Sequence, residues 1–181
     1  MKIIEKIRDR FARSFLLQKA HEQCRKQVPT NLDSAQTAVV LYQVEDEAIY
    51  KTAEAIISKL NDFNLKVRVV AFTSQKIIPH YFIPKITQDI LTSKDVNWRY
   101  HPTKAFFKDL INTEFDILID LTLTENYPLL YCAALSRAGL KAVRYQENNQ
   151  VFYDLLIHTK AEETLESFAE QMIHYLSRIN N

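Results

Sequence analysis

Hydrophobic positions along this chain follow two patterns, short apolar runs and helical spacings of three to four residues, which alternate as in an α/β protein. The apolar runs are rich in β-branched residues and predict strands at residues 37–42, 66–72, 116–121 and 141–145. Helical spacing predicts helices at residues 48–60, 103–112, 128–138 and 161–179, the third ending at Gly139. The alternation predicts a three-layer, Rossmann-like domain with a mostly parallel sheet.

The two remaining apolar segments predict the edges of this sheet. Residues 89–92 have the pattern of a short strand, which would follow the second strand in the order 3-2-1-4-5. About eight residues separate Tyr145 from the last apolar run, at 154–158, and a parallel crossover uses about a dozen or more. We therefore expect five to six strands, the last of them antiparallel at one edge.

The N-terminal segment has the pattern of a long amphipathic helix. Ile4, Ile7, Phe11 and Phe15 share one face over residues 2–27, and the basic residues occupy the other. A break at Pro29 then separates a helix at 1–27 from a single α/β domain at 34–181. The helix has several possible partners: its own domain, a partner protein, a second copy of the chain, or the surface of a membrane.

Composition and charge limit the class of protein. The chain is 47% hydrophobic and 25% charged, without an apolar run long enough to span a bilayer or a recognisable secretion signal, so we expect a soluble cytoplasmic protein. The net charge of +1 combines +5 in residues 1–27 with −4 in the remainder. Because acidic residues are mixed into the basic helix, we expect no nucleic-acid partner.

The motifs of several cofactor and catalytic classes are missing from the sequence. Gly139 is the only glycine, whereas loops that bind phosphates through backbone amides usually need several. Cys24 and Cys132 form no CxxC pair, and His80 and His101 belong to no HxxxH or HExxH motif. No GxSxG motif is present either. We therefore expect no cofactor and no metal.

The candidate ligand site lies where the strand order reverses, between the first strand and the strand at 116–121, since open α/β sheets bind ligands there. The residues that follow these two strands are Gln43, Glu45, Asp46, Asp120, Thr122 and Thr124. Three carboxylates and two hydroxyls suit a cation or a hydroxyl-rich ligand better than a phosphate. In the alternative interpretation, Glu45, Asp46 and Thr124 only begin helices, and Asp120 is held by hydrogen bonds.

A second candidate group precedes the helix at 103–112. It consists of Asp95, Asn97, Trp98 and His101, an aromatic plane with polar neighbours that suits a ligand or partner pocket. The alternative is a buried Trp98 that anchors an irregular loop, with Asp95 and Asn97 bonded to the backbone.

Two resemblances add to this interpretation. Residues 115–145, with the strand FDILIDL, a helix and then LKAVRY, resemble part of the N-terminal Rossmann-like half of heptosyltransferase-type glycosyltransferases. The segment DVNW at 95–98, and YDLLI at 153–157 followed by a terminal helix, resemble a family of small bacterial α/β proteins without assigned activity. The second resemblance implies the extent and the fold of the domain but no reaction.

Two functional hypotheses follow. The first is a non-catalytic binding or protein-interaction domain, because phosphate-loop and nucleophile motifs are missing and one helix has a basic face. The alternative is a glycosyltransferase-like or hydrolytic enzyme, in which Asp120 acts with Glu45 or Asp46 as acid, base or cation ligand.

Overall fold

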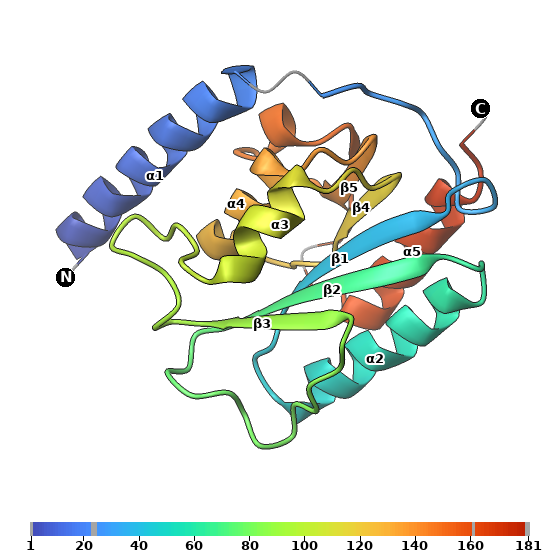
Figure 1. Cartoon of the computed structure of the whole chain (residues 1–181), viewed down its shortest axis with the longest axis horizontal. Helices are drawn as coiled ribbons and strands as arrows, with labels where there is room; N and C mark the ends of the chain where they lie inside the picture. The colour runs from blue at the N-terminus through green and yellow to red at the C-terminus, as the bar shows by residue number, and fades with distance from the viewer. Residues whose placement is uncertain (1, 23–24, 161, 180–181) are drawn as a thin grey trace.

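The central element of the fold is a parallel sheet of six strands in the order β3-β2-β1-β4-β5-β6 (Figure 1). It belongs to a computed structural model that describes residues 2–22, 25–160 and 162–179. The strands are β1 (Thr37–Gln43), β2 (Lys66–Thr73), β3 (Gln88–Thr92), β4 (Ile117–Asp120), β5 (Leu140–Arg144) and β6 (Leu155–Ile157). The predicted order of the first five strands, including the short strand near residue 90, is confirmed.

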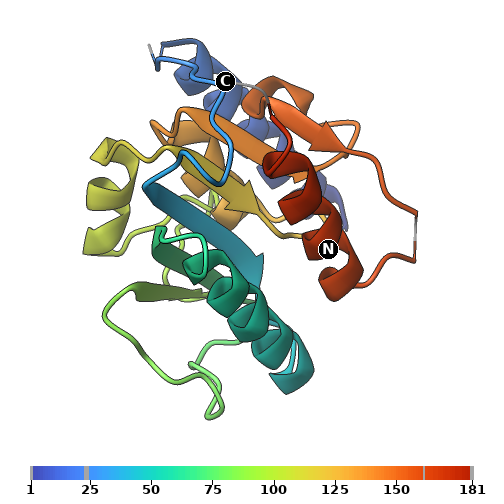
Figure 2. The same ribbon diagram turned by 90° about the vertical axis from the view of Figure 1, so that its right-hand side faces the viewer.

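Helices cover both faces of the sheet, as the buried apolar strands require (Figure 2). One face packs against α2 (Glu47–Asn61) and α5 (Leu165–Leu176). The other face packs against α1 (Lys2–Glu22), α3 (Ala105–Asn112) and α4 (Tyr127–Leu135). Helix α4 is buried from Pro128 to Ala134, because the sheet lies on one side of it and α1 on another.

The predicted antiparallel edge strand is wrong, because β6 runs parallel to β5. Strand β6 has three residues and pairs only with Ala142, Val143 and Arg144, the last part of β5. The start of β6 is therefore level with Ala142, so after the end of β5 the chain has to travel back along the sheet by the length of only two strand residues, about 7 Å. The connection contains one short 3₁₀ turn, Gln150–Phe152, in place of a crossover helix. The minimum length expected for a parallel connection applies to longer strands.

Helix α1 lies on the domain through a face other than the one that carries most of the apolar pattern. Ala12 and Leu16 are fully buried against the α4 side of the sheet. Of the four apolar residues that define the amphipathic pattern, only Phe15 packs against this core, and Ile4, Ile7 and Phe11 are exposed. No helix in the described part of the chain is long and apolar enough to cross a membrane.

Candidate functional site at the carboxyl ends of the strands

A cleft of about 440 Å³ opens at the carboxyl ends of β2, β3 and β4, where α1 forms one wall. Its volume falls within the range of about 300–1,000 Å³ that is common for small-molecule sites. The polar side chains around it come from four separate segments: Arg8 and Asp9, Ser74, Ser93, and Glu125 with Asn126. The cleft therefore lies where ligands bind in open α/β sheets.

Tyr100 reaches this cleft from the loop between β3 and α3, with a backbone φ of 65°. The Asn97 carboxamide oxygen holds the turn by accepting hydrogen bonds from the backbone amides of residues 99 and 101, at 2.8 and 3.2 Å. The Arg8 guanidinium carbon lies over the Tyr100 ring, 3.5 Å from its centroid, and the Tyr127 ring stacks on Tyr100 with the centroids 5.1 Å apart. Its hydroxyl donates to Asp9 Oδ1 at 2.9 Å. A bulky residue at positive φ is strained, and such strain concentrates at functional sites.

The charges that line the cleft nearly balance. Arg8 and Asp9 both contact Tyr100, and Arg13 Nη1 lies 3.7 Å from Glu125 Oε1. Burial raises the pKa of Glu125 above its ordinary value. Arg8 Nε is buried and has no hydrogen-bond partner among the described residues. The cleft therefore has a polar lining without the surplus of positive charge that a phosphate would favour.

The point of strand reversal lies between this cleft and a second, smaller cavity. Asn126 caps α4 by accepting from the Leu129 amide at 3.2 Å, and its Nδ2 donates to Gln43 Oε1 at 2.8 Å. The smaller cavity, about 180 Å³, lies beyond Gln43. Four of the six predicted site residues line it: Gln43, Glu45, Thr122 and Thr124. This volume is below the usual range for a small-molecule site.

The other two predicted residues, Asp46 and Asp120, line neither cavity. Asp46 is the N-cap of α2 and accepts from the Ile49 amide at 2.9 Å. Asp120 is buried and accepts from the Tyr153 hydroxyl at 2.5 Å, and from the amide and hydroxyl of Thr122 at 2.9 and 2.7 Å. Burial raises the pKa of Asp120, although these hydrogen bonds oppose the rise.

The second predicted group does not converge on one pocket. Asp95 accepts from the amide and the hydroxyl of Thr92, and Asn97 holds the turn described above. The His101 ring is half-buried and packs edge-on against Phe107 and Tyr131. Trp98 is 57% exposed, so the alternative in which a buried tryptophan anchors this loop is wrong.

The sequence comparisons place the chain in a family. The model of a family of unknown function, DUF6913, matches residues 8–179. The chain belongs to this family. No curated protein and no solved structure matches it. Membership agrees with the resemblance to an uncharacterised family of α/β proteins, and it assigns no reaction to the DUF6913 domain.

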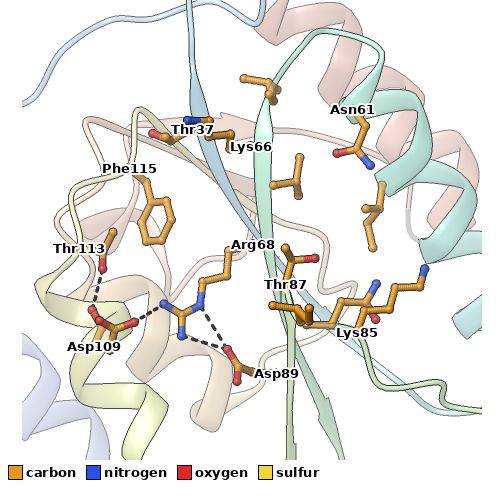
Figure 3. A pocket seen from close by; sticks show the side chains of 15 residues that line it. Thr37, Asn61, Lys66, Arg68, Lys85, Thr87, Asp89, Asp109, Thr113 and Phe115 are labelled. Atoms are coloured by element: carbon orange, nitrogen blue, oxygen red, sulfur yellow. Dashed lines mark hydrogen bonds and ion pairs between the residues drawn. The ribbon is translucent and has the colours of Figure 1, made fainter.

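A larger cavity, about 740 Å³, lies at the opposite end of the sheet, where β1, β2 and β3 begin (Figure 3). Its main charged group is the Arg68 guanidinium, which donates to Asp89 at 3.0 and 3.2 Å and to Asp109 at 2.5 Å (Figure 3). Arg68 thus forms ion pairs with both aspartates. The cavity also lies at the amino ends of the strands, away from the usual ligand-binding end. We therefore assign the candidate site to the carboxyl-end cleft.

Metal and thiol chemistry find little support among the described residues. No group of three histidine, cysteine or acidic side chains is arranged there to hold a metal ion. Cys132 is a buried free thiol, and burial raises its pKa. Cys24 lies outside the described residues.

Sequence reasoning missed the residues that form the main cleft, above all Arg8, Asp9 and Tyr100. Arg8 and Asp9 belong to a helix that it treated as separate from the α/β domain. Tyr100 carries no motif, and only its neighbour Asn97, a residue that favours turns, indicated an unusual backbone there. Lys141 was also missed: it is buried beside α4, and burial lowers its pKa to about 7.

Proposed function

We propose that the protein is a non-catalytic binding domain for a small, uncharged, hydroxyl-rich ligand, held in the cleft between α1 and the carboxyl ends of β2, β3 and β4. The observation that carries this proposal is the polar lining, without a surplus of positive charge, of a 440 Å³ cleft at the ligand-binding end of a parallel sheet.

The side chains around the cleft suit hydroxyl groups in particular. Carboxylates accept hydrogen bonds from hydroxyls, and Asp9 of α1 and Glu125, just before α4, supply carboxylates in the lining of the cleft. The Arg8 guanidinium, which also lines the cleft, carries N–H donors. Tyr127 and Phe72 add aromatic surface for the apolar faces of a polyol or sugar ring.

A titration of the isotopically labelled chain, followed by amide NMR spectra, tests this proposal. Glucose and myo-inositol are the probes, and inorganic phosphate is the comparison. We expect the two polyols to shift the amide signals of Ser74, Ser93 and Asn126, which line the cleft, and phosphate to leave them in place.

A matched pair of variants locates the binding. Ser74→Trp places a large side chain at an exposed position in the cleft, and Ser58→Trp does the same on the outer side of α2. We expect Ser74→Trp to abolish the polyol shifts and Ser58→Trp to retain them. The proposal fails if neither polyol shifts the cleft signals, if phosphate shifts them, or if both variants behave alike.

No observation favours the enzymatic alternative. It requires Asp120 to share a cavity with Glu45 or Asp46, but the Asp120 oxygens already accept three internal hydrogen bonds. A transferase or hydrolase would need to open this buried network before the carboxylate met a substrate.

A further inference from the structure

A row of exposed apolar side chains runs along the outward face of α1. Ile3, Ile4, Ile7 and Phe11 are between 50% and 74% exposed. Their spacing of three or four residues brings them onto one side of the helix. The Trp98 ring, 6.0 Å from the Phe11 ring, extends the row onto the neighbouring loop. We call these five residues the apolar ridge.

The ridge faces outward because the domain takes the other side of the helix. At about 100° per residue, Ile7 and Leu16 lie on opposite sides of α1, and Leu16 is fully buried. Arg8 and Asp9 also face the domain, where they contact Tyr100. Helix α1 lies at the rim of the molecule (Figure 1). It thus turns polar residues toward the domain and isoleucines toward the outside.

Positive charges flank the ridge. Lys6 and Arg10 lie beside Ile7 on the exposed surface of α1, and Arg99 lies against Trp98, 4.9 Å from the ring centroid. None of these three cations forms an ion pair with a residue that the structure describes. The exposed acid Glu5 lies on the side of α1 that also carries Ala12, seven residues later.

We propose that the apolar ridge docks on an anionic lipid bilayer, with α1 lying in the plane of the interface. Interfacial helices combine isoleucine, phenylalanine or tryptophan on one side with lysine and arginine beside them. Tryptophan favours the headgroup level, and cations there are attracted by acidic lipids. Pairing of two copies through this ridge would bring Lys6 and Arg10 of each close to those of the other, so charge complementarity favours the bilayer.

Vesicle co-sedimentation of the full chain tests this proposal, independently of ligand binding in the cleft. The vesicles contain phosphatidylcholine alone, or equal parts of phosphatidylcholine and phosphatidylglycerol. We expect the chain to sediment with the anionic vesicles in about 0.1 M salt. We expect it to be released in about 1 M salt, where the screening length falls from ~10 to ~3 Å.

Two isoleucine variants provide the matched comparison. Ile7→Glu places a negative charge in the ridge, and Ile86→Glu places one at a fully exposed isoleucine in the loop between β2 and β3. We expect Ile7→Glu to weaken binding to the anionic vesicles by about tenfold or more, and Ile86→Glu to bind like the natural chain. Arg10→Gln, which keeps the ridge intact, should weaken binding less and reduce its dependence on salt.

Several results would overturn the proposal. One is a chain that sediments with neither kind of vesicle, and another is an equal loss of binding in the two glutamate variants. A third is a dimer, seen by sedimentation velocity without lipid, that Ile7→Glu dissociates, because the ridge would then pair two proteins. Circular dichroism of each variant tests whether the domain is folded. If the Ile7→Glu variant does not fold, the Arg10→Gln variant still tests the proposal.

Discussion

The hydrogen bond between Tyr153 and Asp120 makes a strong prediction about stability. The Tyr153 hydroxyl donates to Asp120 Oδ2 at 2.5 Å, and both residues are buried. Tyr153→Phe removes this donor and leaves the buried Oδ2 without a partner among the described residues. Because Tyr153 precedes β6, the bond also ties the short β5–β6 connection to the end of β4.

The size of the effect depends on the charge of Asp120. A hydrogen bond to an ionised group contributes about 1.5–3 kcal/mol to the free energy of unfolding, and one to a neutral group about 1 kcal/mol. Burial raises the pKa of Asp120, so this carboxyl destabilises the folded state as pH rises through that raised value. Tyr153→Phe should therefore cost about 2 kcal/mol or more where Asp120 is ionised and about 1 kcal/mol where it is protonated.

Urea unfolding as a function of pH, followed by far-UV circular dichroism, measures how this cost changes as Asp120 ionises. Tyr42→Phe is the matched control, because Tyr42 is fully buried and its hydroxyl has no partner in the described structure. We expect this variant to be neutral or slightly stabilised at every pH, since it removes an unsatisfied polar group.

The reasoning would be refuted by a Tyr153→Phe variant that loses less than about 0.5 kcal/mol where Asp120 is ionised, or that loses the same amount at all pH values. It would also fail if Tyr42→Phe were destabilised to the same extent. Either result would mean that loss of the Tyr153 hydroxyl does not leave a buried, ionised carboxylate short of a donor.

Three further predictions concern single side chains. The pKa of Lys141 is lowered to about 7, so between pH 7 and 10 the folded state binds fewer protons than the unfolded state, and the free energy of unfolding rises with pH. Lys141→Met should remove this rise, as urea titrations of the variant and the natural chain would show. Asp46→Ala, which removes the N-cap of α2, should cost about 1 kcal/mol, whereas Asp33→Ala, at an exposed position outside the helices, should change stability by less than about 0.5 kcal/mol. Hydrogen bonds from the amides of residues 36 and 37 and the Thr37 hydroxyl lower the pKa of Asp116, although burial opposes them. This carboxylate should therefore stabilise the fold above its ordinary pKa and lose that effect as pH falls. The advantage of the natural chain over Asp116→Asn should shrink below about pH 4, and a constant difference down to pH 2 would contradict this assignment.

The sheet and most of its helices were predictable from the sequence. The apolar runs that form β1, β2, β4 and β5 are buried on both faces, and such strands must be covered by helices. Strand β3 follows from a shorter run of the same kind. The order of these five strands, taken as 3-2-1-4-5, is the one that the structure has, but short, right-handed crossovers alone leave the point of reversal open.

The direction of β6 and the seating of α1 were decided by tertiary structure. A length rule predicted an antiparallel last strand, but three residues paired with the end of β5 need little return path. The amphipathic pattern predicted that Ile4, Ile7 and Phe11 would share one helix face. It did not reveal that Ala12 and Leu16 would occupy the narrow space above α4.

The candidate site, too, was determined partly by the sequence and partly by the tertiary structure. The sequence determined which residues follow the strands at the point of reversal, and four of them do line one small cavity. It did not determine that Asp120 would turn into the core toward Tyr153, or that α1 and the loop at Tyr100 would close a larger cleft nearby. Hydrophobic periodicity in the sequence indicates which side chains are buried. Packing between segments distant in the chain decides which surfaces cover those side chains and which polar groups come into contact.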